Sequence, residues 1–178
     1  MKIRIDDLKD KTVELSSEEP LPLYSTLLTL EEAGECHFTA PLEVHLTVVR
    51  EYDHIRVSGK VVTSLSLNCS RCLNGFQMDI GSPFTIFYIK DEGLGQDEDV
   101  ELAEEDLITA TYEGDEIDFT NEITEQVVLA IPIKPLCNED CKGLCPGCGA
   151  DLNEAECACN RDNINLKFNA LKDFIVKG

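Results

Sequence analysis

The fold is decided by a stretch in which apolar and polar residues alternate, His37-Phe-Thr-Ala-Pro-Leu-Glu-Val-His-Leu-Thr-Val48. A period of two is typical of a β-strand with one buried face and one solvated face. Pro41 falls on the polar side, which predicts a sheet edge or a bulge at that position. Two later stretches continue the pattern, with apolar residues at Ile55, Val57, Val61, Leu65 and Leu67, and then at Phe76, Met78, Ile80, Phe84, Ile86 and Tyr88.

Together these three stretches predict an antiparallel β-meander, in which Gly81-Ser82-Pro83 interrupts the third strand. Strands of about 12–14 residues span about 40–45 Å, which is long for a chain of 178 residues. We therefore expect a strongly bent meander or a partial barrel.

Helices are expected at three places around this sheet. A helix is predicted over residues 118–131, because acidic residues open the stretch, Pro132 follows it, and apolar residues recur at helical spacing at Phe119, Ile123, Val127 and Ala130. Leu27–Glu32 is expected to form a helical turn, and a C-terminal helix is expected to bury Phe168, Leu171 and Ile175. One or two of these helices should pack on the sheet, which makes the fold class α+β.

The predicted organisation has two parts. Residues 1–135 are expected to form a β-rich domain with an acidic loop at 91–106. Residues 136–178 are expected to form a Cys-rich zinc-knuckle segment and the C-terminal helix, packed on the first part. No apolar run approaches the roughly 20 residues of a membrane helix, and the first residues lack the apolar core of a secretory signal. We therefore expect a cytoplasmic protein that makes no membrane contact.

The charge of the chain narrows the class of partner. Fifteen Lys and Arg stand against 35 Asp and Glu, for a formal net charge of −20. Between Asp91 and Glu125 there are fifteen acidic residues and no Lys or Arg. This excess of negative charge argues against a protein that binds nucleic acid through a broad basic face, and no DNA binding is expected.

The nine cysteines favour metal binding over a disulfide framework, because their number is odd and the expected compartment is reducing. Eight of them are clustered and suit one or two structural zinc ions with four thiolates each, namely Cys69, Cys72, Cys137, Cys141, Cys145, Cys148, Cys157 and Cys159. Cys69-Ser-Arg-Cys72 falls at the expected hairpin tip between the second and third strands, where both sulfurs can face one ion.

The pairing of these cysteines is open. A local centre of Cys145, Cys148, Cys157 and Cys159 closes the shortest loop and leaves Cys69 and Cys72 to join Cys137 and Cys141. A rival arrangement joins the two CxxC knuckles, Cys69, Cys72, Cys145 and Cys148, in one centre. Chain entropy does not decide between them, because doubling a loop costs only about 0.6 kcal/mol. Reduced cysteines without metal are the third alternative.

Catalytic candidates are weak. His37, His45 and His54 lack the spacing of metal ligands, and Cys36 and His37 should point to opposite faces of a strand. The sequence contains no phosphate-binding loop, GxSxG elbow or HExxH motif. We therefore expect no enzymatic activity. A small basic patch is conceivable around the central hairpin, formed by Arg50, Arg56, Lys60 and Arg71.

Three segments resemble the YceD family. They are Leu67-Asn-Cys-Ser-Arg-Cys-Leu73, the stretch from Ile117-Asp-Phe-Thr-Asn-Glu-Ile123 to Ala130-Ile-Pro-Ile-Lys-Pro-Leu-Cys137, and Cys141-Lys-Gly-Leu-Cys-Pro-Gly-Cys-Gly-Ala-Asp-Leu-Asn153; the terminal Ala170-Leu-Lys-Asp-Phe174 also fits. That family is linked to accumulation of large-subunit ribosomal RNA in bacteria and chloroplasts. The resemblance implies a cytoplasmic ribosome-biogenesis factor without known catalytic activity.

Charge and resemblance together favour a protein partner. Ribosomal RNA would repel so acidic a chain, so a basic ribosomal or rRNA-processing protein is the expected partner. The first alternative is a direct rRNA-binding protein that uses the small basic patch. The second is a thiol redox or zinc-handling protein.

Overall fold

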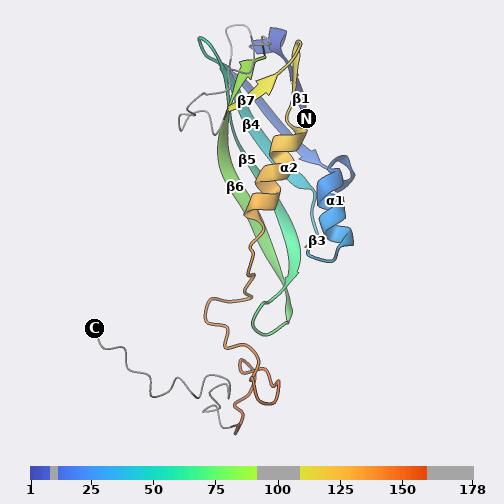
Figure 1. The fold of residues 1–178 in the computed structure, drawn as a ribbon, viewed down its shortest axis with the longest axis vertical. Coiled ribbons are helices and arrows are strands. Elements are labelled where there is room, and N and C mark those ends of the chain that lie inside the picture. The colour runs from blue at the N-terminus through green and yellow to red at the C-terminus, as the bar shows by residue number, and fades with distance from the viewer. Residues whose placement is uncertain (9–11, 92–108, 160–178) are drawn as a thin grey trace, which may run out of the picture. The chain divides into compact units, whose positions relative to one another are not determined.

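In the computed structural model, which describes residues 1–8, 12–91 and 109–159, the alternating stretch lies within a twisted, open six-stranded sheet (Figure 1). The strand order is β2-β4-β5-β6-β7, and the short β3 pairs with β5. The strands are β2 Val13–Glu19, β3 His37–Phe38, β4 Leu42–Arg50, β5 Ile55–Asn68, β6 Gly75–Lys90 and β7 Thr109–Tyr112. This arrangement, with two helices and a Cys-rich segment, confirms the predicted α+β class.

The period-two pattern of β4 is confirmed by burial. Its inward side chains are at most 2% exposed, and they are Leu42, Val44, Leu46 and Val48. β4 pairs antiparallel with both β2 and β5. Pro41 separates β3 from β4, although both strands pair with β5. The predicted irregularity at this proline is therefore present, and its cause is the missing backbone N–H.

The predicted interruption of the third strand is wrong, because β6 runs from Gly75 through Pro83 to Lys90. Glycine at position 81 permits this path because it has no side chain. A Cβ atom there would lie 2.8 Å from the Val61 carbonyl oxygen, which is too close. Pro83 lies outside the Phe87–Lys90 portion that pairs with β7, so its missing N–H removes no bond to that strand. The β6–β7 pair is parallel, so β7 adds a parallel edge strand beside the three strands for which the antiparallel meander was predicted.

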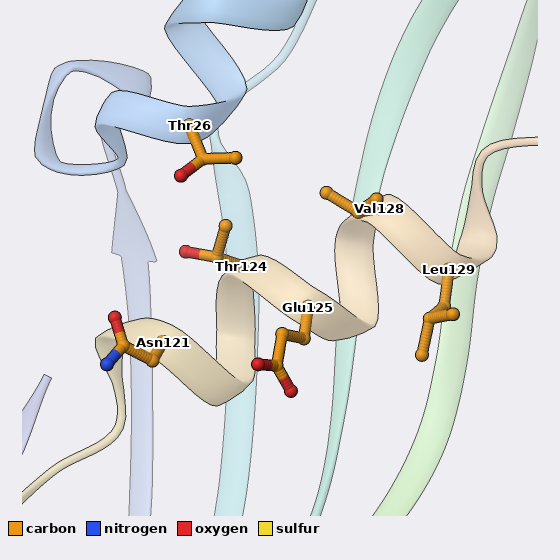
Figure 2. A pocket seen from close by; sticks show the side chains of 6 residues that line it. All are labelled: Thr26, Asn121, Thr124, Glu125, Val128 and Leu129. Atoms are coloured by element: carbon orange, nitrogen blue, oxygen red, sulfur yellow. The ribbon is translucent and has the colours of Figure 1, made fainter.

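Two α-helices accompany the sheet, α1 Ser25–Glu32 and α2 Thr120–Ala130. They contact one another, and a shallow groove of about 530 Å³ runs beside them (Figure 2). The inward stripe of α2 confirms its predicted packing, because Phe119, Ile123 and Val127 are at most 2% exposed. The Phe119 ring meets Tyr88 of β6 edge-on, with ring centroids 5.9 Å apart. Neither α1 nor α2 is long and apolar enough to cross a membrane.

The remaining short elements lie near the N-terminus and before α2. β1 Lys2–Arg4 pairs antiparallel with β8 Glu116–Asp118. Two 3₁₀ turns complete the described chain, η1 Ile5–Leu8 and η2 Leu21–Leu23. The predicted helical turn at Leu27–Glu32 lies within α1.

The chain divides into two compact units. One comprises Met1–Leu67 and Gln77–Ile133, and the other comprises Asn68–Phe76 and Lys134–Gly178. The turn between β5 and β6 thus belongs to the same unit as the Cys-rich segment. Beyond Asp91 the predicted acidic loop at 91–106 lies outside the described residues, as does the predicted C-terminal helix with Phe168, Leu171 and Ile175.

Candidate metal centres

The first centre begins at the turn between β5 and β6, which carries Cys69 and Cys72. The Cys69 amide donates to the Asn74 carbonyl oxygen at 2.9 Å, and the Leu73 amide donates to the Cys69 carbonyl oxygen at 2.9 Å. Leu73 has a φ of 63°, a left-handed conformation that is typical of tight reversals. Both sulfurs therefore sit on one short loop whose backbone is fixed by its own hydrogen bonds.

The segment after α2 is bound to this turn by Arg71, one of the two residues between Cys69 and Cys72. The Arg71 guanidinium donates to the carbonyl oxygens of Glu139 at 3.0 Å and Cys141 at 2.8 Å. In return the Leu144 amide donates to the Arg71 carbonyl oxygen at 3.0 Å. These bonds place the second pair of cysteines, Cys137 and Cys141, opposite the first.

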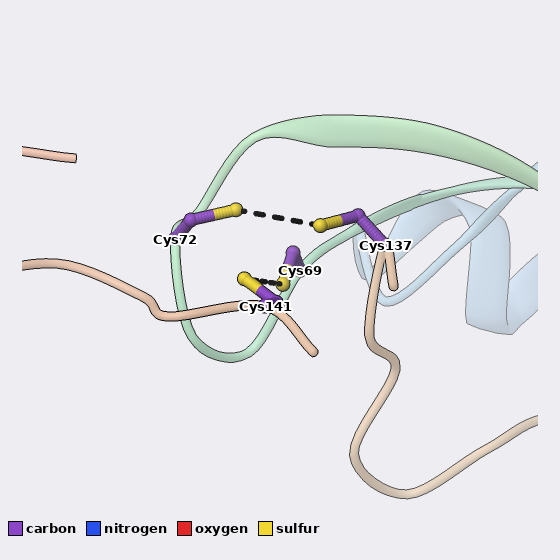
Figure 3. A group of neighbouring side chains, drawn as sticks. All are labelled: Cys69, Cys72, Cys137 and Cys141. Atoms are coloured by element: carbon purple, nitrogen blue, oxygen red, sulfur yellow. Dashed lines mark hydrogen bonds between the residues drawn. The ribbon is translucent and has the colours of Figure 1, made fainter. Parts of the chain in front are cut away.

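The four sulfurs of the first centre gather at one point (Figure 3). The Sγ atoms of Cys69, Cys72, Cys137 and Cys141 all lie within 4.8 Å of one another. Cys69 Sγ is 3.7 Å from Cys141 Sγ, and Cys72 Sγ is 3.7 Å from Cys137 Sγ. An ion about 2.3 Å from four tetrahedral sulfurs holds them about 3.8 Å apart. The spacing therefore fits a tetrahedral metal ion.

The second centre is built on the knuckle Cys145-Pro-Gly-Cys148. The Cys145 amide donates to the Ala150 carbonyl oxygen at 2.8 Å, and the Gly149 amide donates back to the Cys145 carbonyl oxygen at 2.8 Å. The sulfurs of Cys145, Cys148, Cys157 and Cys159 also lie within 4.8 Å of one another, and the Cys145–Cys157 pair is 3.2 Å apart. This group can hold a second ion.

The two centres share a backbone motif. The Arg71 amide lies 3.4 Å from Cys69 Sγ, and the Gly147 amide lies 3.4 Å from Cys145 Sγ. In each case the first cysteine of a CxxC knuckle accepts a hydrogen bond from the amide two residues later. Such N–H groups stabilise a thiolate before and after a metal binds.

The centres differ in burial. Three of the four cysteines in the first centre are buried, and only Cys137 is exposed. In the second centre Cys145 alone is buried. Phe76, Leu136 and Leu144 pack around the buried sulfurs of the first centre. Of the two centres, the second is therefore the one more open to solvent.

Ionisation within each centre is uneven. Backbone amides, those of Cys137 and Cys72 foremost, lower the pKa of Cys69 to about 6. The backbone amides of Cys148 and Gly147 do the same for Cys145, whose pKa is also about 6. Hydrogen bonding to the Cys148 and Cys145 sulfurs raises the pKa of Cys159 to about 12. Four thiolates so close together repel one another, and a divalent cation relieves that repulsion.

The sequence left two pairings of the cysteines open, and the structure has the local one. Cys145 and Cys148 lie with Cys157 and Cys159, whereas the rival joining of the two knuckles is not the grouping found. The sequence analysis missed the part that Arg71 plays. The position of Arg71 inside a CxxC knuckle was the available signal, because the intervening residues of a knuckle face whatever segment closes the centre.

The other candidate groups are members of neither centre. Cys36 is buried, and burial raises the pKa of its thiol. His37 lies 2.6 Å from Glu31, and the His45 ring shares a 2.8 Å hydrogen bond with Ser16. These residues occupy structural positions at the core and surface of the sheet.

The basic patch predicted around the hairpin is partly engaged in intramolecular bonds. Arg56 Nε donates to Glu51 at 2.6 Å, and the Arg71 guanidinium donates to the two carbonyl oxygens described above. Arg50 and Lys60 are exposed. Within the described part of the chain, Arg50 and Lys60 are therefore the members of the predicted patch that present their charge to solvent without a counter-group.

An open sheet and two groups of four cysteines that could hold metal ions define a small β-rich protein, and sequence comparison identifies its family. The model of the family described as large ribosomal RNA subunit accumulation protein YceD matches residues 57–175. The chain belongs to the YceD family, which confirms the resemblance inferred from the cysteine-containing segments.

Curated relatives come from plants and bacteria. The chain is 31% identical over 152 residues to "Large ribosomal RNA subunit accumulation protein YCED homolog 1, chloroplastic" of Arabidopsis thaliana, covering 74% of this chain and 47% of that protein. The homologue of the same name in Zea mays is 30% identical over 159 residues, covering 76% and 54%. An uncharacterized protein of Mycobacterium tuberculosis is 29% identical over 113 residues, covering 64% and 52%. The chain spans about half the length of these relatives. No solved structure matches it significantly.

Proposed function

We propose that this chain is a non-enzymatic ribosome-biogenesis factor that supports accumulation of large-subunit ribosomal RNA. The observation that carries the proposal is membership of the YceD family, whose description names that role. The plant relatives carry the same description. The chain would act by binding a basic ribosomal or rRNA-processing protein, with two structural zinc ions holding its Cys-rich unit.

The assignment of zinc rests on the donor set and its spacing. Four thiolates in a tetrahedral arrangement are the typical ligands of structural zinc, and they leave no coordination position for a substrate. The sulfur spacing of 3.7 Å in the first centre fits that ion. Zinc in these centres would fold and brace the unit and would not perform chemistry.

Metal analysis of the reduced, anaerobically purified chain tests this assignment, and we expect two zinc ions per chain. Cys148→Ser should remove about one of them, while Cys36→Ser, the matched control outside both centres, should remove none. Purified wild-type chain that holds no zinc, and binds none when it is supplied, would refute both centres.

A non-catalytic role is supported by the side chains available. The described histidines bond to neighbouring carboxylates or hydroxyls at the surface. Cys36 lies in the core with a raised pKa, which suppresses the thiolate that a nucleophile needs. Ser16 and His45 form a hydroxyl–imidazole pair at 2.8 Å, but among the described residues no carboxylate orients that histidine ring.

The choice of a protein partner rests on charge. A formal net charge of −20 repels a polyphosphate backbone and attracts Lys- and Arg-rich proteins. Direct rRNA binding has less support, because Arg56 and Arg71 of the candidate patch are engaged in intramolecular bonds. Two zinc ions would add four positive charges, and the eight thiolates that bind them add eight negative charges. The net charge of the chain therefore stays negative.

Co-purification from growing cells, with and without RNase, tests the partner. We expect ribosomal or processing proteins to remain bound after RNase treatment and to be released by salt. Neutralising five acidic residues outside the described part of the chain should weaken recovery, and they are Asp97, Glu98, Asp99, Glu104 and Glu105. Loss of all partners with RNase, together with loss in an Arg50→Ser, Lys60→Ser variant, would favour direct rRNA binding instead.

A further inference from the structure

The C-terminal half of α2 exposes apolar side chains on the side that faces away from the sheet. Leu129 is 76% exposed and Val128 is 38% exposed, and Ile133, just beyond the helix, is 97% exposed. The same helix buries Ile123 and Val127 almost completely against the sheet. The helix is therefore apolar on two sides, and only one of them has a partner within the described residues.

Two of these exposed side chains, Val128 and Leu129, border the groove beside α1 and α2. Thr26 of α1 lies on one side, and the residues from α2 are Asn121, Thr124, Glu125, Val128 and Leu129 (Figure 2). Figure 2 shows Val128 and Leu129 at one end of the row and Asn121 at the other. The groove thus combines an apolar end with a polar end along one helix.

The charge around the groove has one sign. Glu125 is the charged side chain among those that line the groove. The two helices also carry Glu31, Glu32 and Glu122 and no Lys or Arg, and Glu31 is paired with His37 at 2.6 Å. Lys2 of β1 is bonded to Glu116 at 3.0 Å and Asp118 at 3.5 Å, and the first Lys after α2 in the sequence is Lys134, next to Ile133.

The helix backbone adds to this field. The last turn of α2, where Val128 and Leu129 lie, contains no basic residue. The partial negative charge of the helix C-terminus is therefore uncompensated by α2 itself beside the apolar end of the groove.

We propose that the groove beside α1 and α2 docks an amphipathic segment of a basic protein. Its apolar side chains would cover Val128 and Leu129, and its Lys or Arg side chains would face Glu125 and the C-terminal carbonyls of α2. This inference rests on the proposed function, because it places the contact of the basic partner on this groove. A nucleic acid or an anionic membrane finds no positive group among the described residues that line the groove. A second copy of this chain would bring like charges together.

A defined probe tests the groove directly. The zinc-supplied full chain is titrated into a fluorescent amphipathic helix of Leu and Lys, and anisotropy reports binding. The matched probes replace every Leu by Ser, or every Lys by Glu. We expect binding of the Leu/Lys probe that weakens with salt, and at least tenfold weaker binding of the other two probes, because apolar contact and charge are both required.

Variants locate the site. Leu129→Ser should weaken binding of the Leu/Lys probe about tenfold or more, and Glu125→Gln should reduce its salt dependence. Tyr52→Ser is the matched control, because Tyr52 is a fully exposed apolar side chain on the β4–β5 turn and does not line the groove. Equal affinities of the Leu129→Ser and Tyr52→Ser chains, or equal binding of the Ser/Lys probe, would overturn the proposal.

Two further measurements separate this proposal from the function on which it rests. If Leu129→Ser retains every RNase-resistant partner in cells, the groove proposal fails while the proposed function stands. If the wild-type chain recovers no ribosomal or processing protein, the proposed function fails, whatever the probe shows. A dimer seen by sedimentation at rising concentration, and abolished by Leu129→Ser, would assign the groove to a second copy and overturn the proposal.

Discussion

Replacing Gly143 by Ala should weaken the first metal centre more than an equivalent replacement nearby. Gly143 has a φ of +71°, and a Cβ atom there would lie 2.9 Å from the Arg71 carbonyl oxygen. That oxygen accepts the bond from the Leu144 amide that ties the Cys-rich segment to the hairpin turn. Gly149 is the matched control, because its φ is +74° and a Cβ atom there would meet nothing within 4 Å.

The expected magnitudes follow from these contacts. The left-handed backbone costs about 1–2 kcal/mol when Ala replaces Gly, and this cost applies to both variants. At Gly143 the contact with Arg71 must also lengthen or break one backbone hydrogen bond, which adds about 0.5–1.5 kcal/mol. Because folding and metal binding are coupled in such units, Gly143→Ala should lower the zinc affinity of the first centre about tenfold through the backbone cost and a further two- to tenfold through the Arg71 contact. Gly149 adjoins Cys148 of the second centre, so Gly149→Ala should lower the zinc affinity of the first centre less.

The assay is release of zinc from the loaded chain to a chelator of known affinity, followed with a colorimetric indicator. The two zinc ions are distinguished by repeating the titration in a Cys148→Ser background, which retains the first centre. Identical release curves for Gly143→Ala and Gly149→Ala in that background would refute the reasoning, because the contact with Arg71 would then carry no energy.

Three further predictions concern the sheet, a turn and the thiols. Ile123→Ala should lower the free energy of unfolding by about 2–5 kcal/mol in chemical denaturation, while the exposed Leu129→Ala should change it by less than about 0.5 kcal/mol; similar values would contradict the packing described. The Asp53 carboxylate, which shares a hydrogen bond with His54, raises the pKa of that histidine. The stabilisation from protonated His54 should therefore be complete below about pH 6.5 and be lost as pH rises through the pKa of His54 in the folded state. An NMR titration that places this pKa below 6.5 would contradict the prediction. Because the pKa of Cys69 and of Cys145 is about 6, calorimetry should find more protons released per zinc at pH 5 than at pH 7, and equal release would contradict these values.

The sequence predicted the centre of the sheet better than its edges. Alternation is strong in β4, where one face is fully buried. β2 was not predicted, because Val13-Glu-Leu-Ser-Ser-Glu-Glu19 loses its apolar alternation after Leu15 at the edge of the sheet. The parallel β7 was missed for another reason. Its four residues pair with the far end of β6, and no local pattern reports which distant strand a short strand joins.

Glycine and proline misled the prediction of β6. They normally break strands, but Gly81 lies where β6 approaches the Val61 backbone, and Pro83 lies where β7 does not pair. These tertiary circumstances are not encoded in the run Gly81-Ser82-Pro83 itself.

The sequence identified the eight cysteines of the two centres but not their grouping. Loop entropy varies too weakly with length to choose a pairing. The grouping found in the structure is accompanied by backbone bonds between the hairpin turn and the later segment, such as the Ser70 amide to the Pro135 carbonyl oxygen at 2.8 Å. Such bonds appear only once the two segments have met.

The separation in sequence of the first centre's cysteines sets an order of events during synthesis. Cys72 precedes Cys137 by 65 residues, so at about 5–20 residues per second the ribosome takes roughly 3–13 s to supply the partner. During that interval Cys69 and Cys72 have been synthesised, but the other two cysteines of the first centre have not. The second centre is encoded between Cys145 and Cys159 and waits only about 1–3 s at the same rate. In a newly made chain, the first centre is thus the one whose cysteines are longest exposed to oxidants and stray metals before assembly.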